Sequence, residues 1–102
     1  MRVVKPSRIR AMAQNYPLAA ESLMAWLKIV RVADWKNLHQ VRETYPGADG
    51  VVVGSGRVVT VFNIGGNKYR LLVAIHYQWS MVYVLRFITH VEYDKNKWKA
   101  EL

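Results

Sequence analysis

The stretch at residues 57–88, RVVTVFNIGGNKYRLLVAIHYQWSMVYVLRFI, decides the fold of this chain. Its β-branched and aromatic residues are interrupted by two sets of turn residues, Gly65-Gly66 and Gln78-Trp79-Ser80. Runs of this kind, bounded by short turns, are typical of antiparallel strands joined as hairpins. Adjacent glycines suit a two-residue hairpin turn, because both can take a positive φ without a Cβ clash. We therefore expect strands at 57–64, 67–77 and 81–88.

The predicted turns also determine which residues share a face of the sheet. A two-residue turn at Gly65-Gly66 places Val61 opposite Arg70, and a three-residue loop at 78–80 places Arg70 opposite Ile88. Opposed residues share a face, and side chains alternate along each strand. One face is then almost wholly apolar and is expected to pack on helices: Val58, Thr60, Phe62, Ile64, Tyr69, Leu71, Val73, Ile75, Tyr77, Met81, Tyr83, Leu85 and Phe87.

The opposite face is expected to carry the cations of this region. No Asp or Glu occurs between Asp49 and Glu92. In the predicted register Arg70 and Arg86 are diagonal neighbours, about 7–8 Å apart at their Cα atoms. A solvated sheet face usually mixes both charge signs, so an acid-free face predicts a site for an anionic ligand. This face would hold Val59, Val61, Asn63, Leu72, Ala74, His76, Val82, Val84 and Ile88 together with all four cations, Arg57, Lys68, Arg70 and Arg86.

Helical patterns precede this sheet region. Apolar residues recur at helical spacing from Ile9 to Tyr16, and a second such stripe runs to Val30 after Pro17, which suits the first turn of a helix. We expect these segments to form a helical hairpin that covers one face of the sheet. Asp34 is the expected cap of a third helix at 35–44, and a further strand is expected at 51–53.

A terminal helix is expected at residues 89–98, where Thr89 and Glu92 have the spacing of a capping box. On that helix His90, Tyr93 and Lys97 would share one stripe, close to the Arg70 end of the cationic face. Histidine is the residue type best suited to proton transfer near neutral pH. A histidine at a helix start is more often a capping or surface residue, so a catalytic and a structural role both remain open for His90.

Composition limits the classes of protein that fit. The 102 residues suggest a single domain over 1–102, and the net charge of +8 with a pI of about 10.1 favours a polyanionic partner. Cysteine is absent, and the N-terminus lacks the apolar run of a signal peptide, so we expect a cytoplasmic protein that does not span a membrane. No residues have the spacing of a metal site or of a phosphate or dinucleotide loop, and we expect no cofactor.

Two motifs together carry a family resemblance. The sequence NIGGNKYR at residues 63–70, followed about 20 residues later by THVEYD at 89–94, resembles the HigB-type toxins of the RelE-like superfamily of type II toxin–antitoxin systems. The resemblance covers nearly the whole chain. It implies an α+β fold in which an N-terminal helical hairpin packs on a small, mainly antiparallel twisted sheet with a short C-terminal helix.

The resemblance also implies an activity and partners. Proteins of this type are mRNA interferases, which cleave mRNA on the translating ribosome by metal-free attack of the ribose 2′-OH on the adjacent phosphate. A cognate HigA-type antitoxin with a helix-turn-helix domain would neutralise the toxin, and operator DNA would be bound only through that antitoxin. Arg70 would clamp the phosphate, His90 would act as acid or base, and Tyr93 would transfer or orient a proton. The expected RNA-binding residues are Arg57, Asn67, Lys68, Arg86 and Lys97.

Two other classes of protein remain open from the residues alone. A non-catalytic RNA-binding module would keep the cationic face but would not need His90 or Tyr93. A protein-interaction subunit would use the same face to dock an acidic partner. The convergence of cations beside His90 and Tyr93 favours the endoribonuclease.

Overall fold

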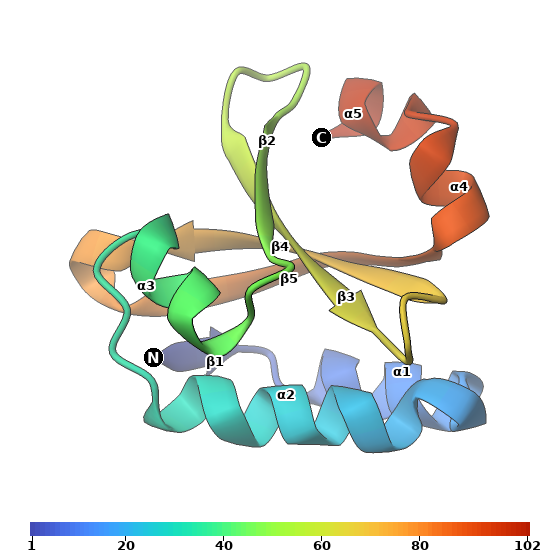
Figure 1. Ribbon diagram of the computed structural model, residues 1–102, viewed down its shortest axis with the longest axis horizontal. Helices are drawn as coiled ribbons and strands as arrows, with labels where there is room; N and C mark the ends of the chain where they lie inside the picture. The colour runs from blue at the N-terminus through green and yellow to red at the C-terminus, as the bar shows by residue number, and fades with distance from the viewer.

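A five-stranded sheet divides the molecule into two layers (Figure 1). The computed structural model describes residues 1–102. The strand order is β1-β5-β4-β3-β2, in which β1 runs parallel to β5 and all other neighbours are antiparallel. The strands are β1 (Arg2–Val4), β2 (Asp49–Val52), β3 (Val58–Ile64), β4 (Tyr69–His76) and β5 (Met81–Thr89).

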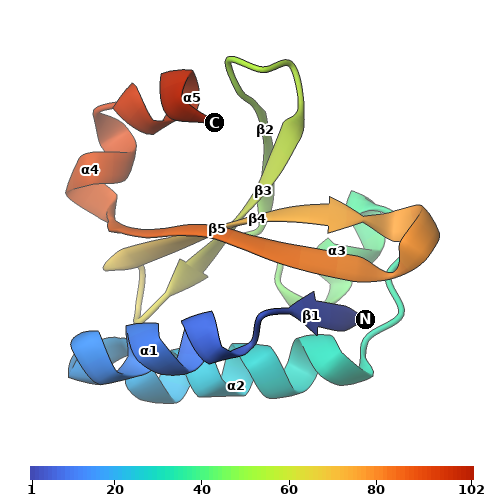
Figure 2. The ribbon, with the colours of Figure 1, turned by 180° about the vertical axis from the view of Figure 1, so that it is seen from behind.

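The predicted helical hairpin covers one face of this sheet. It consists of α1 (Ser7–Asn15), a 3₁₀ turn η1 (Pro17–Ala19) and α2 (Ala20–Val32), and Figure 2 shows both helices along the same side of the strands. Their stripes bury Ile9, Leu23 and Trp26 in the main core. These side chains meet the sheet through residues such as Phe62, whose ring packs edge-on against Trp26 at 5.5 Å. The α+β architecture is therefore as expected.

The β3–β4 hairpin is looser than predicted. Four residues, 65–68, separate the two strands, and Asn63 pairs with Arg70 where Lys68 was expected. Gly65, Gly66 and Asn67 all have positive φ, of 64°, 63° and 69°. The register is thus shifted by two residues. Because side chains alternate with a period of two, this shift leaves Arg70 on the face where it was predicted.

A β-bulge in β5 does change the predicted faces. Arg86 pairs with Leu72 as expected, but beyond it the register shifts by one residue, so that Val84 pairs with Val73. Val82 and Val84 are consequently buried in the main core, and their prediction on the cationic face was wrong. Met81, Tyr83 and Leu85 correspondingly leave the helix-facing side. A bulge adds one residue to one strand and reverses the alternation beyond it.

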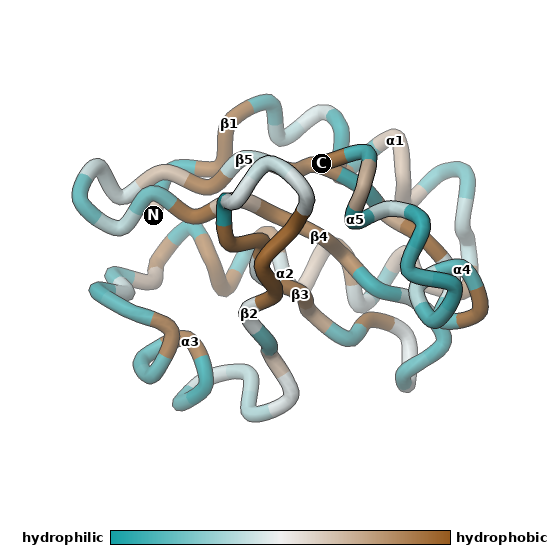
Figure 3. Tube along the Cα trace, turned by 90° about the horizontal axis from the view of Figure 1, so that it is seen from above, coloured by the Kyte–Doolittle hydropathy of each residue, from teal (hydrophilic) through white to brown (hydrophobic).

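The C-terminal segment covers part of the other face. The chain leaves β5 into α4 (His90–Asp94) and then α5 (Lys97–Glu101), in place of the single helix predicted at 89–98. Asn96, with a φ of 62°, breaks the helix between them. Trp98 is buried against the sheet in a second, smaller core, whose other buried members are Val53, Val59, Val61 and Leu72. In Figure 3 the hydrophobic residues of β2 and β3 contrast with the largely hydrophilic α4.

Two local features differ from the sequence expectations. The strand β1 was not predicted, although Arg2, Val3 and Val4 pair with residues 81–83 of β5. The third helix, α3 (Leu38–Thr44), begins later than expected, and its cap is Asn37, whose Oδ1 accepts a 3.0 Å hydrogen bond from the Gln40 amide. Asp34 instead forms an exposed ion pair with Lys36 at 3.2 Å. None of the helices is both long and apolar enough to span a bilayer.

Candidate functional site

The two sequence motifs meet at one end of the sheet. Tyr69 pairs with Thr89, and the His90 amide donates a 3.0 Å hydrogen bond to the Lys68 carbonyl. Thr89 caps α4 as predicted, because its Oγ1 accepts a 3.2 Å hydrogen bond from the Glu92 amide. The β3–β4 turn and the start of α4 are therefore fixed to each other by backbone contacts. Lys68 and His90 lie side by side there, and both are exposed.

Arg70 is oriented by its own turn. Its Nη1 donates to the carbonyl oxygens of Asn67 at 2.7 Å and Tyr69 at 3.1 Å. Its Cζ lies 5.6 Å from the centroid of the Tyr93 ring. Arg70 has no carboxylate partner, and its Nε and Nη2 make no hydrogen bond to protein. A guanidinium held at one nitrogen with its other donors free is suited to bind a phosphate.

Tyr93 links Arg70 to the second core. Its ring stacks on Trp98 at 5.1 Å with an interplanar angle of 19°, and the Trp98 Nε1 donates a 2.9 Å hydrogen bond to the Tyr93 carbonyl. Burial raises the pKa of the Tyr93 phenol above its ordinary value of 10.0, with a further increase from the negative charge of Asp49 and a partial decrease from Arg70. The phenol therefore stays protonated at neutral pH and can donate a hydrogen bond or a proton.

His90 is accessible but not isolated. Its side chain is about half exposed, and its Nδ1 lies 3.8 Å from Oδ2 of Asp94, one turn later on α4. The Asp94 carboxylate is therefore near the imidazole, at a distance longer than that of a hydrogen bond. His90, Arg70 and Tyr93 thus occupy the same end of the sheet, as the sequence predicted.

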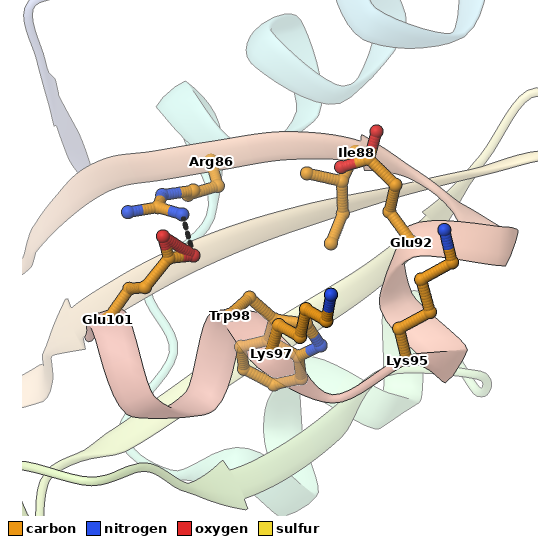
Figure 4. A pocket seen from close by; sticks show the side chains of 7 residues that line it. All are labelled: Arg86, Ile88, Glu92, Lys95, Lys97, Trp98 and Glu101. Carbon is orange, nitrogen blue, oxygen red and sulfur yellow. Dashed lines mark hydrogen bonds and ion pairs between the residues drawn. The ribbon is translucent and has the colours of Figure 1, made fainter.

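Arg86 and Lys97 line a hollow beside Trp98. This pocket, of about 250 Å³, is lined by Arg86, Ile88, Glu92, Lys95, Lys97, Trp98 and Glu101 (Figure 4). The predicted stripe of His90, Tyr93 and Lys97 was wrong in its last member, because the break at Asn96 places Lys97 on α5. Arg86 is also not an unpaired cation, since its Nη1 lies 2.8 Å from Oε1 of Glu101.

The remaining predicted RNA contacts are divided. Asn67 forms part of the turn that holds Arg70, and its side chain is exposed. Arg57 lies just before β3, at the end of the strand remote from Asn63 and Arg70, so the structure does not bring it to the site. The loop beside Arg57 contacts α5 instead, where the Gly54 amide donates a 2.8 Å hydrogen bond to the Lys99 carbonyl.

The sequence reasoning missed two residues that shape the site. Asp49, at the start of β2, acts electrostatically on Tyr93 and pairs with Arg42 at 3.3 Å. Trp98 holds the Tyr93 ring through their stacking contact. Asp49 pairs with Val61, on the face that carries Arg70. A predicted pairing of β2 with β3 would therefore have placed Asp49 near the site. No group of three or more His, Asp or Glu side chains is arranged to hold a metal ion.

Comparison with known proteins identifies the family of this site. Residues 19–96 match the family model described as HigB_toxin, RelE-like toxic component of a toxin-antitoxin system. The chain belongs to the HigB toxin family. Both motifs that meet at Lys68 and His90 lie within the matched residues, so the HigB family match includes Arg70, His90 and Tyr93.

Individual HigB relatives are distant but match over most of their length. The mRNA interferase HigB of Escherichia coli O6:H1 is 23% identical over 95 residues, which cover 93% of this chain and 90% of that protein. The mRNA interferase toxin HigB of Escherichia coli K12 is 23% identical over 94 residues, covering 92% and 88%. The mRNA interferase HigB of Shigella flexneri has the same identity and coverage.

Proposed function

We propose that this HigB-family chain is an mRNA interferase, an endoribonuclease that cuts mRNA on the translating ribosome and so inhibits translation. The observation that carries the proposal is the grouping of Arg70, Tyr93 and His90 at one end of the sheet, with the His90 amide bonded to the Lys68 carbonyl. The relatives' names and the family match support the same activity.

The chemistry requires a cation, a proton acceptor and a proton donor. In metal-free cleavage the ribose 2′-OH attacks the adjacent phosphorus and the 5′-oxygen leaves, while negative charge develops on the phosphorane. Arg70 has free guanidinium donors for the phosphate oxygens. Lys68, whose backbone is bonded to that of His90, supplies a second positive charge at this end of the sheet. These two cations would lower the barrier by stabilising charge that is greatest in the transition state.

The proton-transfer roles follow from the surroundings of the two side chains. Tyr93 has a raised pKa and is protonated at neutral pH, so we assign it as the donor that stabilises the phosphorane or protonates the leaving oxygen. His90, exposed and next to Asp94, is assigned as the base that accepts the 2′-OH proton. Asp94 places a negative charge 3.8 Å from the imidazole that accepts this proton.

The family context defines the partners in this proposal. The substrate is mRNA in the cytoplasm, and the basic surface of a chain with net charge +8 would contact ribosomal RNA through phosphates. The neutralising partner is a cognate antitoxin of the HigA type, with a helix-turn-helix domain that binds operator DNA.

Growth and mRNA cleavage after induction without the antitoxin test the proposal. We expect the wild-type chain to stop growth and to produce mRNA ends that primer extension detects. Arg70→Ala and His90→Ala should each lower cleavage by about 10²-fold or more, in the range of lost electrostatic or acid–base catalysis. Arg57→Ala is the matched control, because it removes a sheet arginine remote from the site.

The alternatives give different results in the same experiment. RNA binding without cleavage, even on ribosomes, would identify a non-catalytic RNA-binding module. Cleavage that persists in folded Arg70→Ala and His90→Ala variants would overturn the assignment of the site. Circular dichroism and thermal unfolding of each purified variant establish that it is folded.

A further inference from the structure

Half of the cationic sheet face is not covered by the C-terminal helices. α4 and α5 lie over the end of the sheet that carries the proposed active site, whereas the β4–β5 turn projects from the opposite end (Figure 1). Beyond the bulge, Tyr83 pairs with Ala74 and Val4, and Met81 pairs with His76 and Arg2. These pairings place their side chains on the same face as Arg86 and Arg70.

Aromatic side chains gather on this uncovered half. The His76 and Tyr83 rings meet edge to face at 5.1 Å with an interplanar angle of 67°. Trp79, in the turn between β4 and β5, is 68% exposed. Exposed aromatic rings on an open sheet are suited to stack on nucleobases.

A basic hollow adjoins the Tyr83 ring. It has a volume of about 270 Å³ and is lined by Val4, Lys5, Arg8, Tyr83, Val84 and Leu85. Arg8 donates hydrogen bonds to the carbonyl oxygens of Val84 and, at 3.2 Å, Leu85, which fixes its charge at the edge of β5. Lys5 has a φ of 55°, which is unusual for a lysine and is typical of functional segments. No acidic residue lines this hollow.

The strand β5 runs from the hollow to the proposed active site. The strand leads from Tyr83 past Arg86 to Thr89, and six residues of extended chain span about 20 Å. That distance matches roughly six phosphates at the 3.4 Å spacing of a stacked strand, and fewer in an extended one. One single strand can therefore contact both places.

We propose that the uncovered half of this face, with Lys5, Arg8, His76, Trp79 and Tyr83, is a second subsite for single-stranded RNA, which holds substrate nucleotides away from the scissile phosphate. The inference rests on the proposed ribonuclease function. Aromatic rings next to cations, in line with a phosphate-binding site, favour RNA over an acidic protein. A protein partner would not require the two places to lie along one strand.

The test is binding of single-stranded RNA of two lengths to the full wild-type chain and its variants. The probes are uncleavable 2′-O-methyl RNAs of about 4 and about 12 nucleotides, because the shorter one fills a single site and the longer one reaches both. The subsite variant combines Lys5→Asn, His76→Gln and Trp79→Ala; asparagine is chosen because it tolerates positive φ. The matched control combines Lys28→Asn and Leu18→Ala, which change exposed residues on the helical layer.

We expect the subsite variant to bind the long probe at least about tenfold more weakly, consistent with one lost stacking contact, and to bind the short probe like wild type. For the long probe, the slope of log K against log [salt] should decrease in magnitude by about 0.7, because the variant lacks one cation. Unchanged affinity for the long probe in a folded subsite variant would overturn the inference, while Arg70→Ala separately tests the active site. If the subsite variant instead lost affinity only for the purified antitoxin, the surface would be a protein-docking site and the RNA assignment would be wrong.

Discussion

Tyr93 has several contacts that fix its position and one group that is free to react. Its ring is near the Arg70 guanidinium and stacks on the Trp98 indole, and its carbonyl accepts the Trp98 Nε1 hydrogen bond. None of these contacts uses the phenolic oxygen. The hydroxyl can therefore be removed with little effect on packing, which separates its chemistry from its structural role.

Substitution of Tyr93 by Phe should reduce mRNA cleavage by about 10²- to 10⁴-fold, the contribution expected of a general acid or base. The stability should change little, because the ring still stacks on Trp98 and packs against Arg70. The measurements are single-turnover cleavage on ribosome-bound mRNA and thermal unfolding of the purified variant. A Tyr93→Phe variant with wild-type cleavage would exclude the phenol from proton transfer.

Local sequence spacing predicted some of the site residues better than others. His90 was placed correctly because the predicted cap at Thr89 is present. Arg70 kept its predicted face because the register error of the β3–β4 hairpin was two residues. Arg86 was predicted to be unpaired, yet its partner Glu101 is 15 residues later, outside the acid-free stretch. A stretch without Asp or Glu can still contact an acidic side chain, because folding brings residues from other parts of the chain next to it.

The predicted faces of the sheet were right where the register error was an even number of residues and wrong where it was an odd number. The two-residue error in the β3–β4 hairpin changed no faces, whereas the one-residue bulge in β5 reversed Val82 and Val84. The bulge has no evident signal in the run 81–88, since apolar residues occupy both faces. The break at Asn96 was missed because the pattern continues through it, although asparagine is among the residues that adopt a positive φ most readily.

α5 is held to the sheet mainly by the packing of Trp98. The ion pair between Glu101 and Arg86 contributes little to stability and is expected to affect RNA binding instead. Glu101→Gln removes an ion pair whose side chains are 35% and 56% exposed, so the unfolding free energy should fall by no more than about 1 kcal/mol. The same change removes a carboxylate beside Arg86 and Lys97. We expect affinity for single-stranded RNA to rise about two- to fivefold, or roughly 0.4–1 kcal/mol, the range of an exposed charge interaction.

Two comparisons distinguish this effect from its alternatives. Glu21→Gln makes the same change of net charge on the helical layer and should leave RNA affinity nearly unchanged. Trp98→Ala should instead cost about 3–5 kcal/mol of stability and reduce cleavage, because Tyr93 loses its stacking partner. Weaker RNA binding by Glu101→Gln would show that the carboxylate positions Arg86 for RNA.

The whole molecule uses the two faces of one sheet for different purposes. One face packs on the helical hairpin and contains the main core, including Trp26 and Phe62. The other carries the smaller core under Trp98, the candidate active site and the uncovered basic half. Half-buried tyrosines occur in both layers, so their ionisation reports on the integrity of the entire fold.

Alkaline pH should destabilise the protein through three of these tyrosines. Burial raises the pKa of Tyr45, Tyr77 and Tyr93 above 10.0, and a hydrogen bond with Thr60 partly opposes the increase at Tyr77. The folded state therefore holds these protons more tightly than the unfolded chain. The stabilisation is fully present below pH 10 and is lost as the pH rises through the folded pKa values.

Between the unfolded and folded pKa values, the free energy of unfolding should fall by up to about 1.4 kcal/mol per pH unit for each of the three protons. Urea unfolding at a series of pH values measures this slope, and ultraviolet absorbance of the phenolates measures the titration directly. Tyr45→Phe and Tyr77→Phe should each remove the contribution of one proton, up to about 1.4 kcal/mol per pH unit, from this slope. The phenylalanine ring preserves the packing. If phenolates formed in the folded protein at the same pH as in the denatured chain, burial would not control these tyrosines.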